Sequence, residues 1–369
     1  MLKATVARGT LYESAQIVGR AVSGRSTLPV LNNFFIEGRD QTLRLVATDL
    51  EVGMEAIVDA KVEEQGSLTV PARILTEVLA NLPEADVSLE VDESNAVQVT
   101  CRRSDYHIRG LPAEEFSTLP DLLEPLALEL PQAVLRRAIL ETTFASSPDE
   151  TRPILTGALF ALGADEIRVV ATDTHRLALR KLPGSAGLSE SLNVIVPARV
   201  LNEVSRVLRD DAEEPVDIAV SENQVRFRVG RITVQSRLID GQFPNYEKVI
   251  PEASERRVVA RTAELQDALR RALIVAREDA NRVKLEPAGD VMTILADSQD
   301  VGRVNEEVPV ELKGDALEIA FNARYLLDVL NVMESENVEL ALNGPLNPGL
   351  VRAPDDDSYV YVLMPMQIM

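Results

Sequence analysis

Two residues near the middle of the chain have types and spacing that suit acid–base chemistry. Asp173 and His175 follow directly after Thr172, and a histidine beside a carboxylate is a common general acid or base. The aligned position of an earlier, similar segment carries Glu51, so the pattern itself does not require a histidine there. Two interpretations are therefore open, a catalytic pair or a polar wall of a binding pocket.

Thiol and metal chemistry have few candidate residues. The chain of 369 residues contains one cysteine, Cys101, and two histidines, His107 and His175. These are too few thiolate and imidazole ligands for a structural zinc site or an iron–sulfur cluster, and one cysteine excludes an intramolecular disulfide. No apolar run approaches the length of a membrane span, and no signal peptide is recognisable. We therefore expect no metal, no cofactor, no membrane contact and a cytoplasmic location.

The segment that holds Asp173 occurs more than once. RLVATDLEV in the first third is similar to RVVATDTHR in the second, so that Asp49 and Asp173 lie 124 residues apart. Asp297 follows at the same interval within a weaker match, MTILADSQD. An interval this long is the size of a domain and is far longer than a solenoid repeat.

A second series of segments has almost the same interval. VPARILTEV, VPARVLNEV and FNARYLLDV place an arginine at Arg73, Arg199 and Arg324. Three such units fill the chain, and we predict three versions of one domain at 1–125, 126–251 and 252–369. The extended, proline-bearing segments near 111–126 and 238–252 are the expected linkers.

Each unit mixes two hydrophobic periods. Alternating, β-branched stretches predict several antiparallel strands, and apolar residues at helical spacing predict two helices per unit. Strands and helices do not alternate as in βαβ units, so we expect the α+β class, with helices on one side of a sheet. The predicted helices span 8–25, 72–82, 132–145, 198–209, 262–277 and 322–333.

The charge is distributed unevenly between helices and the rest. The net charge is −21, which would repel nucleic acid if it were spread evenly. The six predicted helices nevertheless carry thirteen arginines, no lysine and seven acidic residues. Two interpretations of these arginines are open. They are simply good helix formers that pair with glutamate on solvated helix faces. Alternatively, they form one common surface that binds phosphates. No base-reading motif is present, so such a face would bind DNA without sequence preference.

Several long segments resemble one family. GRSTLPVLNNF (24–34), TRPILTGALF (151–160), VATDTHRLA (170–178), DGQFPNYEKVIP (240–251) and YVLMPMQIM (361–369) are similar to the bacterial DNA polymerase III β subunits, the replicative sliding clamps. The resemblance covers essentially the whole chain. It implies three domains of the DNA-clamp fold, each with two helices and antiparallel sheets, in a head-to-tail dimer that forms a ring around duplex DNA.

The resemblance also implies a function without chemical catalysis. Such a ring tethers the replicative polymerase to its template and gives it processivity. The implied partners are duplex DNA, the polymerase III catalytic subunit, the clamp loader, other polymerases and repair proteins that bind through short peptides, and a second copy of the chain. The implied location is the nucleoid. A clamp paralogue that serves DNA repair and an enzyme that uses Asp173 and His175 are the alternatives.

The resemblance assigns site residues position by position. Residues near the DNA path are Arg25, Arg73, Arg152 and Arg199, to which helical spacing adds Arg206. The hydrophobic peptide cleft between the second and third domains takes Leu155, Thr172, His175, Arg176, Leu177, Pro244, Val249, Val362, Met364, Pro365 and Met366. The dimer interface takes Tyr106, Ile108, Ile274 and Val275. The chain departs from the family pattern at Pro153–Ile154, where some relatives have aromatic residues that touch DNA, and at its last residues, Gln367, Ile368 and Met369.

Overall fold

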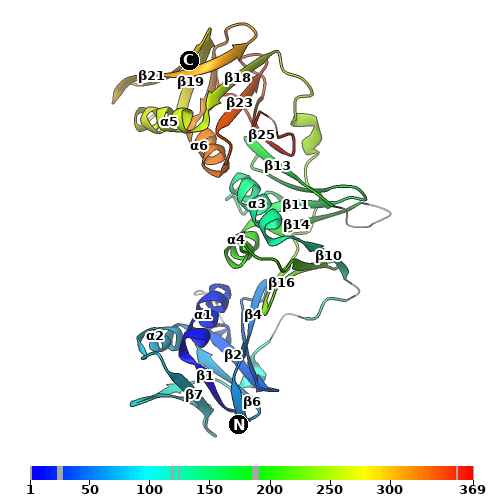
Figure 1. Ribbon diagram of the computed structural model, residues 1–369, viewed down its shortest axis with the longest axis vertical. Helices are drawn as coiled ribbons and strands as arrows, with labels where there is room; N and C mark the ends of the chain where they lie inside the picture. Colours follow the sequence, from blue (N-terminus) through cyan, green and yellow to red (C-terminus); the bar gives the residue numbers. More distant parts are fainter. Residues whose placement is uncertain are drawn as a thin grey trace. The chain divides into compact units, whose positions relative to one another are not determined.

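The threefold repeat is visible in the order of secondary-structure elements. The computed structural model describes residues 2–22, 28–117, 120–123, 125–184, 191–354 and 356–368. A strand, a helix, a set of strands, a second helix and three further strands occur three times in that order (Figure 1). Leu75, Leu201 and Leu326 share one position of the repeat, and each is at most 1% exposed. The predicted threefold repetition is therefore confirmed.

All six predicted helices end earlier in the structure, four of them by one or two residues and the first and third by three or more. The first leaves α-helical geometry after Val18 and continues as the 3₁₀ turn Gly19–Ala21, because glycine favours a helix poorly. The third ends at Thr142, whose hydroxyl bonds to the carbonyl of Ala138 at 2.6 Å. The α-helices of the described residues are α1 (Arg8–Val18), α2 (Ala72–Asn81), α3 (Gln132–Thr142), α4 (Ala198–Val207), α5 (Thr262–Ala276) and α6 (Ala323–Val332).

The chain divides into two compact units, and each has its own sheets. The first unit comprises Met1–Arg136 and Arg199–Leu238, and the second comprises Arg137–Ala198 and Ile239–Met369. In the first unit, one antiparallel sheet has the order β5 (Lys61–Glu64), β1 (Lys3–Ala7), β7 (Asp86–Val91), β8 (Ala96–Cys101), β9 (Ser104–Arg109). The other has the order β10 (Leu126–Leu130), β15 (Val216–Val220), β16 (Gln224–Val229), β17 (Ile232–Arg237), β4 (Val52–Asp59), β3 (Thr42–Thr48), β2 (Asn33–Arg39), β6 (Gly66–Pro71).

The second unit contains a single twelve-stranded antiparallel sheet. Its first half has the order β14 (Leu192–Pro197), β11 (Gly157–Leu162), β12 (Ile167–Thr172), β13 (Arg176–Leu182), β25 (Tyr359–Leu363), β24 (Gly349–Arg352). It continues with β23 (Asn337–Leu342), β18 (Arg256–Arg261), β21 (Gly302–Lys313), β20 (Val291–Ser298), β19 (Arg282–Ala288), β22 (Ile319–Asn322).

Neighbouring repeats are joined edge to edge through these sheets. In the first unit, β4 of the first repeat pairs with β17 of the second. In the second unit, β13 of the second repeat pairs with β25 of the third. We call these pairings the first junction and the second junction. Both have the same antiparallel form, so the repeats share continuous sheets across their boundaries.

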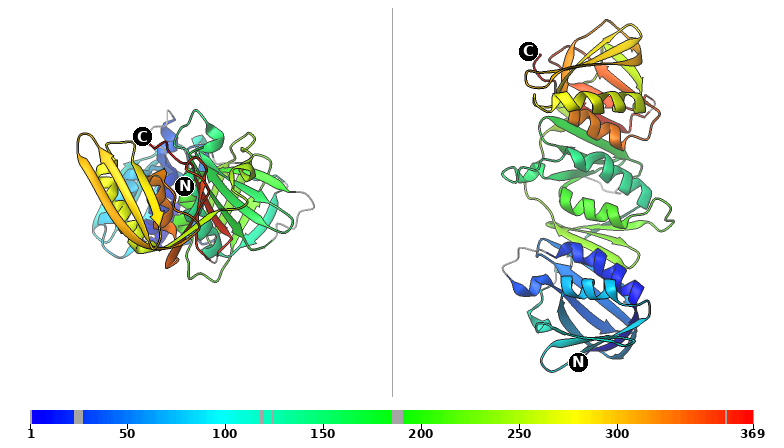
Figure 2. Two further views of the ribbon diagram at one scale, coloured as in Figure 1. Left: turned by 90° about the horizontal axis from the view of Figure 1, so that it is seen from above. Right: turned by 90° about the vertical axis from the view of Figure 1, so that its left-hand side faces the viewer.

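The helices cover one face of the sheets in each unit. In the first unit, α1 lies beside α2 and packs on β3 and β4 (Figure 2). Leu43 and Leu45 of β3 are fully buried, whereas Arg44 between them is partly exposed on the opposite face. In the second unit, α5 lies beside α6 and packs on β20 and β21. The alternation along β3 therefore distinguishes a helix-covered face of the sheet from an open face.

Candidate functional site

Asp173 builds the turn between β12 and β13. One of its carboxylate oxygens accepts hydrogen bonds from the backbone amides of His175 at 2.9 Å and Arg176 at 3.0 Å. The hydroxyl of Thr172 donates to the carbonyl of Arg176 at 2.6 Å. The His175 side chain is exposed, and only its backbone takes part in this turn. Asp173 is therefore a turn-forming residue, and the geometry gives no support to an Asp–His catalytic pair.

The side chain of Arg176 fixes this turn to the third repeat. Its guanidinium, in a side chain that is 10% exposed, pairs with Asp173 at 3.1 Å and with Asp328 of α6. It also donates to the carbonyl of Phe144 at 2.7 Å. The guanidinium carbon lies 4.2 Å from the ring centre of Tyr325, a cation–π distance. Arg176 therefore holds the second junction together, with its donors occupied inside the protein.

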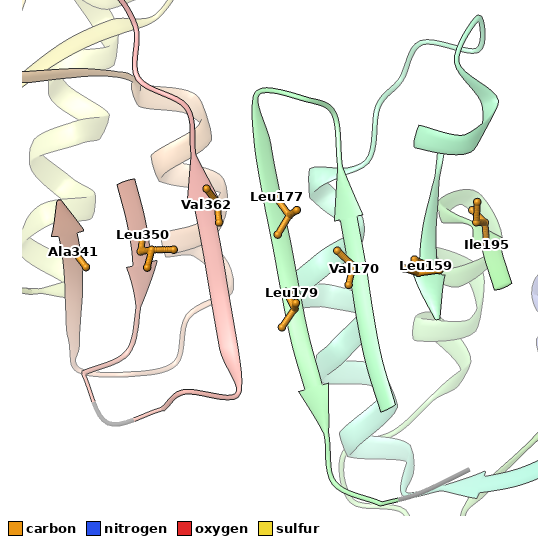
Figure 3. Packing of buried hydrophobic residues seen from close by; sticks show 8 residues of the cluster. All are labelled: Leu159, Val170, Leu177, Leu179, Ile195, Ala341, Leu350 and Val362. Carbon is orange, nitrogen blue, oxygen red and sulfur yellow. The ribbon is translucent and has the colours of Figure 1, made fainter. Parts of the chain in front are cut away.

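Beside the turn lies a cluster of buried apolar residues on both sides of the second junction (Figure 3). In the sheet, Leu177 of β13 pairs with Val362 of β25, and Val362 pairs with Leu350 of β24. Half-buried residues of the segment 239–250, including Phe243 and Val249, pack against the same cluster. The buried members of this apolar cluster are Leu159, Val170, Leu177, Leu179, Ile195, Ala341, Leu350 and Val362.

Arg168 holds the segment that covers the cluster. Its guanidinium donates to the Tyr246 hydroxyl at 3.3 Å and pairs with Glu247 at 2.7 Å. Hydrogen bonds to Tyr246 and Glu166 raise the pKa of Arg168 above its ordinary value, so it stays charged. The segment between the second and third repeats is thus fixed against β12, and Val249 is held over apolar surface.

The end of the chain is held beside the turn. The backbone amide of Met364 donates to the carbonyl of His175 at 2.9 Å, and that of Met366 donates to Ala320 at 2.7 Å. Arg282 donates to the carbonyl of Gln367 at 3.1 Å. The side chains of Met364, Pro365 and Met366 are only partly buried. This tail therefore offers flexible, polarizable thioethers at the surface and is not part of the core.

The structure brings most of the predicted cleft residues into one neighbourhood. Leu177, Val362 and Val249 meet in the apolar cluster, and Thr172, His175 and Arg176 form the turn to which the methionine tail is bonded. Leu155 is buried in the 3₁₀ turn Pro153–Leu155, and Pro244 is exposed on the segment that covers the cluster.

Sequence reasoning did not identify the partners of Arg176. Phe144, Tyr325 and Asp328 come from distant parts of the chain, and only the fold brings them together. The one available signal was the repeat, since Asp328 follows Glu77 and Glu203 at the same position of the second helix.

The predicted DNA-contacting arginines that the structure describes are at least partly exposed, and each is paired with an acid. Arg73 pairs with Glu77 at 2.8 Å, and Arg206 with Glu203 at 2.6 Å. Arg199 pairs with Asp49 at 3.0 Å, and Arg152 with Asp149 at 3.2 Å. In all four pairs the arginine side chain remains 46–87% exposed. Water screens exposed pairs of this kind, so a phosphate can replace the carboxylate. Arg25 lies outside the described residues.

Two of the four predicted dimer residues, Tyr106 and Ile274, are exposed. Tyr106 on β9 is 39% exposed, whereas Ile108 on the same strand is 8% exposed and belongs largely to its own core. On α5, Ile274 is 65% exposed and Val275 is partly buried. Strand β9 is the last in its sheet, and among the described residues Gly302–Pro309 of β21 pairs on one side only, with β20.

Three family models match the chain in succession. They are the N-terminal, central and C-terminal domains of the DNA polymerase III beta subunit, and they match residues 2–120, 129–245 and 247–367. The chain belongs to the DNA polymerase III beta subunit family. Its function is therefore that of a DNA sliding clamp in replication, and its fold is three successive clamp domains.

Curated and solved relatives match over the full length. The beta sliding clamp of Bacillus subtilis is 33% identical over 99% of this chain and 100% of its own, and that of Staphylococcus aureus is 32% identical over all of both chains. The crystal structure of the B. subtilis DNA polymerase sliding clamp covers 100% of both chains with a TM-score of 0.95. A Pseudomonas aeruginosa sliding clamp bound to griselimycin also covers both chains completely, with 34% identity and a TM-score of 0.95.

Within the residues that the structure describes, no group of three or more histidine, cysteine, aspartate or glutamate side chains could hold a metal ion. None of the helices in the described ranges is long and apolar enough to cross a membrane.

Proposed function

We propose that two copies of this chain close head to tail into a ring around duplex DNA, without catalysing a reaction. The chain supplies three clamp domains, with limits near 1–125, 126–251 and 252–369, and the exposed arginines of its helices, such as Arg73 and Arg199, face the DNA. A sequence-independent phosphate contact needs only such exposed guanidinium groups. The ring works in the nucleoid and tethers the polymerase III catalytic subunit to its template.

The open strand edges support closure of the ring. One protomer's β9 and its partner's β21 can add to one another, because each offers an unpaired edge. The charges are opposite on balance. Arg103 precedes β9 and Arg109 ends it, with Asp105 within the strand. The open part of β21 carries Glu306 and Glu307 beside Arg303. Exposed Ile274 would be covered in the same contact. An interface between two different surfaces forms a ring only when the rotation from chain to chain adds up to a full circle, and two chains of three domains each would close it.

We place peptide binding by the clamp loader, polymerases and repair proteins at the apolar cluster and the methionine tail. Half-buried Val249 and Val360 pack against the apolar cluster, and the partly exposed Met364 and Met366 lie beside it. Met-rich surfaces adapt to varied apolar side chains, which suits a site with several partners. A paralogue serving repair would share this site, so the replicative role rests on family membership.

The decisive observation for the ring is the combination of three clamp domains with two open, oppositely charged strand edges. The test is retention on nicked circular DNA after loading by a clamp loader and ATP. We expect the loaded protein to survive a high-salt wash and to leave when the circle is linearised, because a topological link does not depend on salt. Loss in salt together with indifference to linearisation would mean an ordinary phosphate-binding face.

The ring contact can be tested separately by its oligomeric state. Ile274→Asp should convert the dimer to a monomer in sedimentation, because it places a charge in the covered contact. Leu346→Asp is the matched control, since Leu346 is also exposed, at 74%, in the third repeat. Equal dissociation by both variants would contradict the proposed interface.

The peptide site can be probed with griselimycin, the ligand of the solved Pseudomonas relative. We expect binding to this chain, and a loss of about tenfold for a variant that combines Met364→Ala and Met366→Ala. Met333→Ala is the control, because Met333 is also partly buried but lies directly after α6 and not in the methionine tail. Unchanged affinity of the double variant would move the peptide site elsewhere.

A further inference from the structure

The first junction contains a pocket at the position that corresponds to the apolar cluster. It has a volume of about 200 Å³ and lies on the face of the eight-stranded sheet opposite the helices. Two cross-strand rows form its floor, one running across β3, β4, β17 and β16 through Thr48, Gly53, Gln235 and Arg226. The second row crosses the same strands through Val46, Glu55, Thr233 and Arg228.

The same rows at the second junction are apolar. The row that begins at Thr172 crosses β12, β13, β25 and β24 through Leu177, Val362 and Leu350. The row that begins at Val170 continues through Leu179 and Val360. Position by position, Leu177, Val362 and Leu350 thus correspond to Gly53, Gln235 and Arg226. The repeated architecture therefore forms the same site twice, once with apolar and once with polar, arginine-rich lining.

Two of the three arginines at this polar pocket have no acidic partner among the described residues. Arg226 is half-buried and Arg228 is exposed, and neither forms an ion pair within the part of the chain that the structure describes. Arg44 is paired with Glu55 at 2.8 Å and Glu37 at 3.5 Å. Asp121 lines the pocket as well. The positive charge that remains available thus belongs to Arg226 and Arg228.

We propose that this pocket binds an acidic, extended peptide segment of a partner protein. Arg226 and Arg228 are two residues apart on β16, so they lie on one face about 6–7 Å apart along the strand. An extended peptide with carboxylates at every second residue has the same spacing. Arginine binds carboxylates bidentately. The Gln235 side chain opposite Arg226 is held in place, because its amide nitrogen donates to the Pro120 carbonyl and to the Gln224 side-chain oxygen, both at 2.6 Å.

The face of the sheet favours a protein partner over DNA. The pocket lies opposite the helix-covered face, as the burial of Leu43 and Leu45 and the partial exposure of Arg44 show. In the proposed ring the helices line the DNA path, so the pocket faces outward; this step rests on the proposed function. A protein of net charge −21 repels acidic peptides over most of its surface. The two arginines without an acidic partner within the described ranges would therefore direct an acidic peptide to this pocket.

The test uses the full-length protein without DNA or loader. A fluorescein-labelled peptide of alternating Glu and Thr residues is titrated with the protein at low ionic strength, and anisotropy is read. We expect saturable binding that weakens about tenfold for each of Arg226→Gln and Arg228→Gln. Asp121→Asn should act in the opposite direction and tighten binding severalfold, which no loss of folding could produce.

Matched controls separate the pocket from general charge. Arg231 lies on the same hairpin but does not line the pocket, so Arg231→Gln should bind the peptide like the unaltered protein. Val249→Ala at the apolar cluster should also leave binding unchanged. Equal losses in Arg231→Gln and Arg226→Gln would overturn the proposal, as would stronger binding by a single-stranded oligonucleotide or full displacement by equimolar inorganic phosphate.

Peptide binding at this pocket and closure of the ring around DNA can be tested independently. Arg226→Gln should still be retained on circular DNA and released by linearisation. Failure of peptide binding with normal retention would reject this inference alone, whereas failure of retention in the unaltered protein would reject the proposed function.

Discussion

The turns at the two junctions have the same backbone but different roles. In Thr48–Val52, Asp49 accepts from the amides of Glu51 and Val52 at 3.0 and 2.8 Å, and Thr48 donates to the carbonyl of Val52 at 2.8 Å. In Thr172–Arg176, the corresponding three distances are 2.9, 3.0 and 2.6 Å. Leu50 and Thr174 even share a left-handed backbone, with φ of 75° and 80°.

The difference lies in the last residue of each turn. Val52 is an apolar residue, 5% exposed, whereas Arg176 at the same position reaches Asp328 in the next repeat. The free oxygen of Asp49 pairs instead with Arg199 of α4, at 3.0 Å. The repeat therefore sets the backbone at both junctions, and single side chains decide what each junction holds together and what lines it.

The largest effect is expected from exchanging a residue between the junctions. Leu179→Glu introduces the residue found at the corresponding position, Glu55, into the apolar cluster. Because Leu179 is 3% exposed, the charge would be buried without a partner at a cost of about 5 kcal/mol. The melting temperature should fall sharply. Glu55→Leu is the reciprocal control and should change stability by less than about 1 kcal/mol, since it breaks a partly exposed ion pair. Equal losses would mean that the two linings are equivalent.

Removing the side chain that distinguishes the two turns should have the next largest effect. Arg176→Ala leaves Asp173 buried without its arginine, which costs about 3–5 kcal/mol. Faster amide exchange in β13 and β25, with β4 and β17 unchanged, would locate the loss at the second junction. Faster exchange in all four strands would show that Arg176 supports the whole chain.

The shared part of the turns predicts equal, smaller effects. Thr48→Val and Thr172→Val each remove a hydroxyl that donates to a backbone carbonyl and accepts from a backbone amide of the same turn, so each should cost about 1–2 kcal/mol. Denaturant unfolding of the two variants would measure this. A cost for one of them more than twice that of the other would contradict the equivalence of the turns.

The smallest effect is expected from acid at the second junction. Burial alone would raise the pKa of Asp356, but hydrogen bonds from Ser358 and the charge of Arg180 outweigh it and hold that pKa below its usual 3.8. A depressed pKa means that Asp356 stabilises the fold above about pH 3.8, and that this contribution is lost as the pH falls through the folded value. Asp356→Asn should therefore lower stability at neutral pH but not at pH near 2. An equal loss at both would exclude this linkage.

The sequence predicted a large part of the fold because the repeat supplied an internal comparison. Leu75, Leu201 and Leu326 were aligned by spacing alone, and all three are core residues. The third repeat does not have the aspartate at the corresponding place in the turn. Asp297 lies within β20 and accepts from Arg303, while the hydroxyl of the next residue, Ser298, accepts amide hydrogen bonds in the turn that follows. A weak match preserved the strand but not the hydrogen-bonding residue.

The candidate site was less predictable. Leu177, Val362 and the methionine tail came from resemblance to a family, since apolar residues at strand spacing look the same in any core. Nothing in the sequence predicted that Arg176 would be clamped between Phe144 and Tyr325. Side chains so far apart along the chain meet only after the second and third repeats join.

The sequence by itself determined the threefold repeat, the helix and strand periods, and the excess of arginine over acidic residues in the predicted helical segments. These are local or periodic properties, and local chemistry fixes them. The tertiary structure alone decided that sheets run through the junctions, that Arg176 pins one of them, and that Arg226 and Arg228 lie in the counterpart of the apolar cluster. These depend on strand register between distant segments, which is set by packing across the whole sheet.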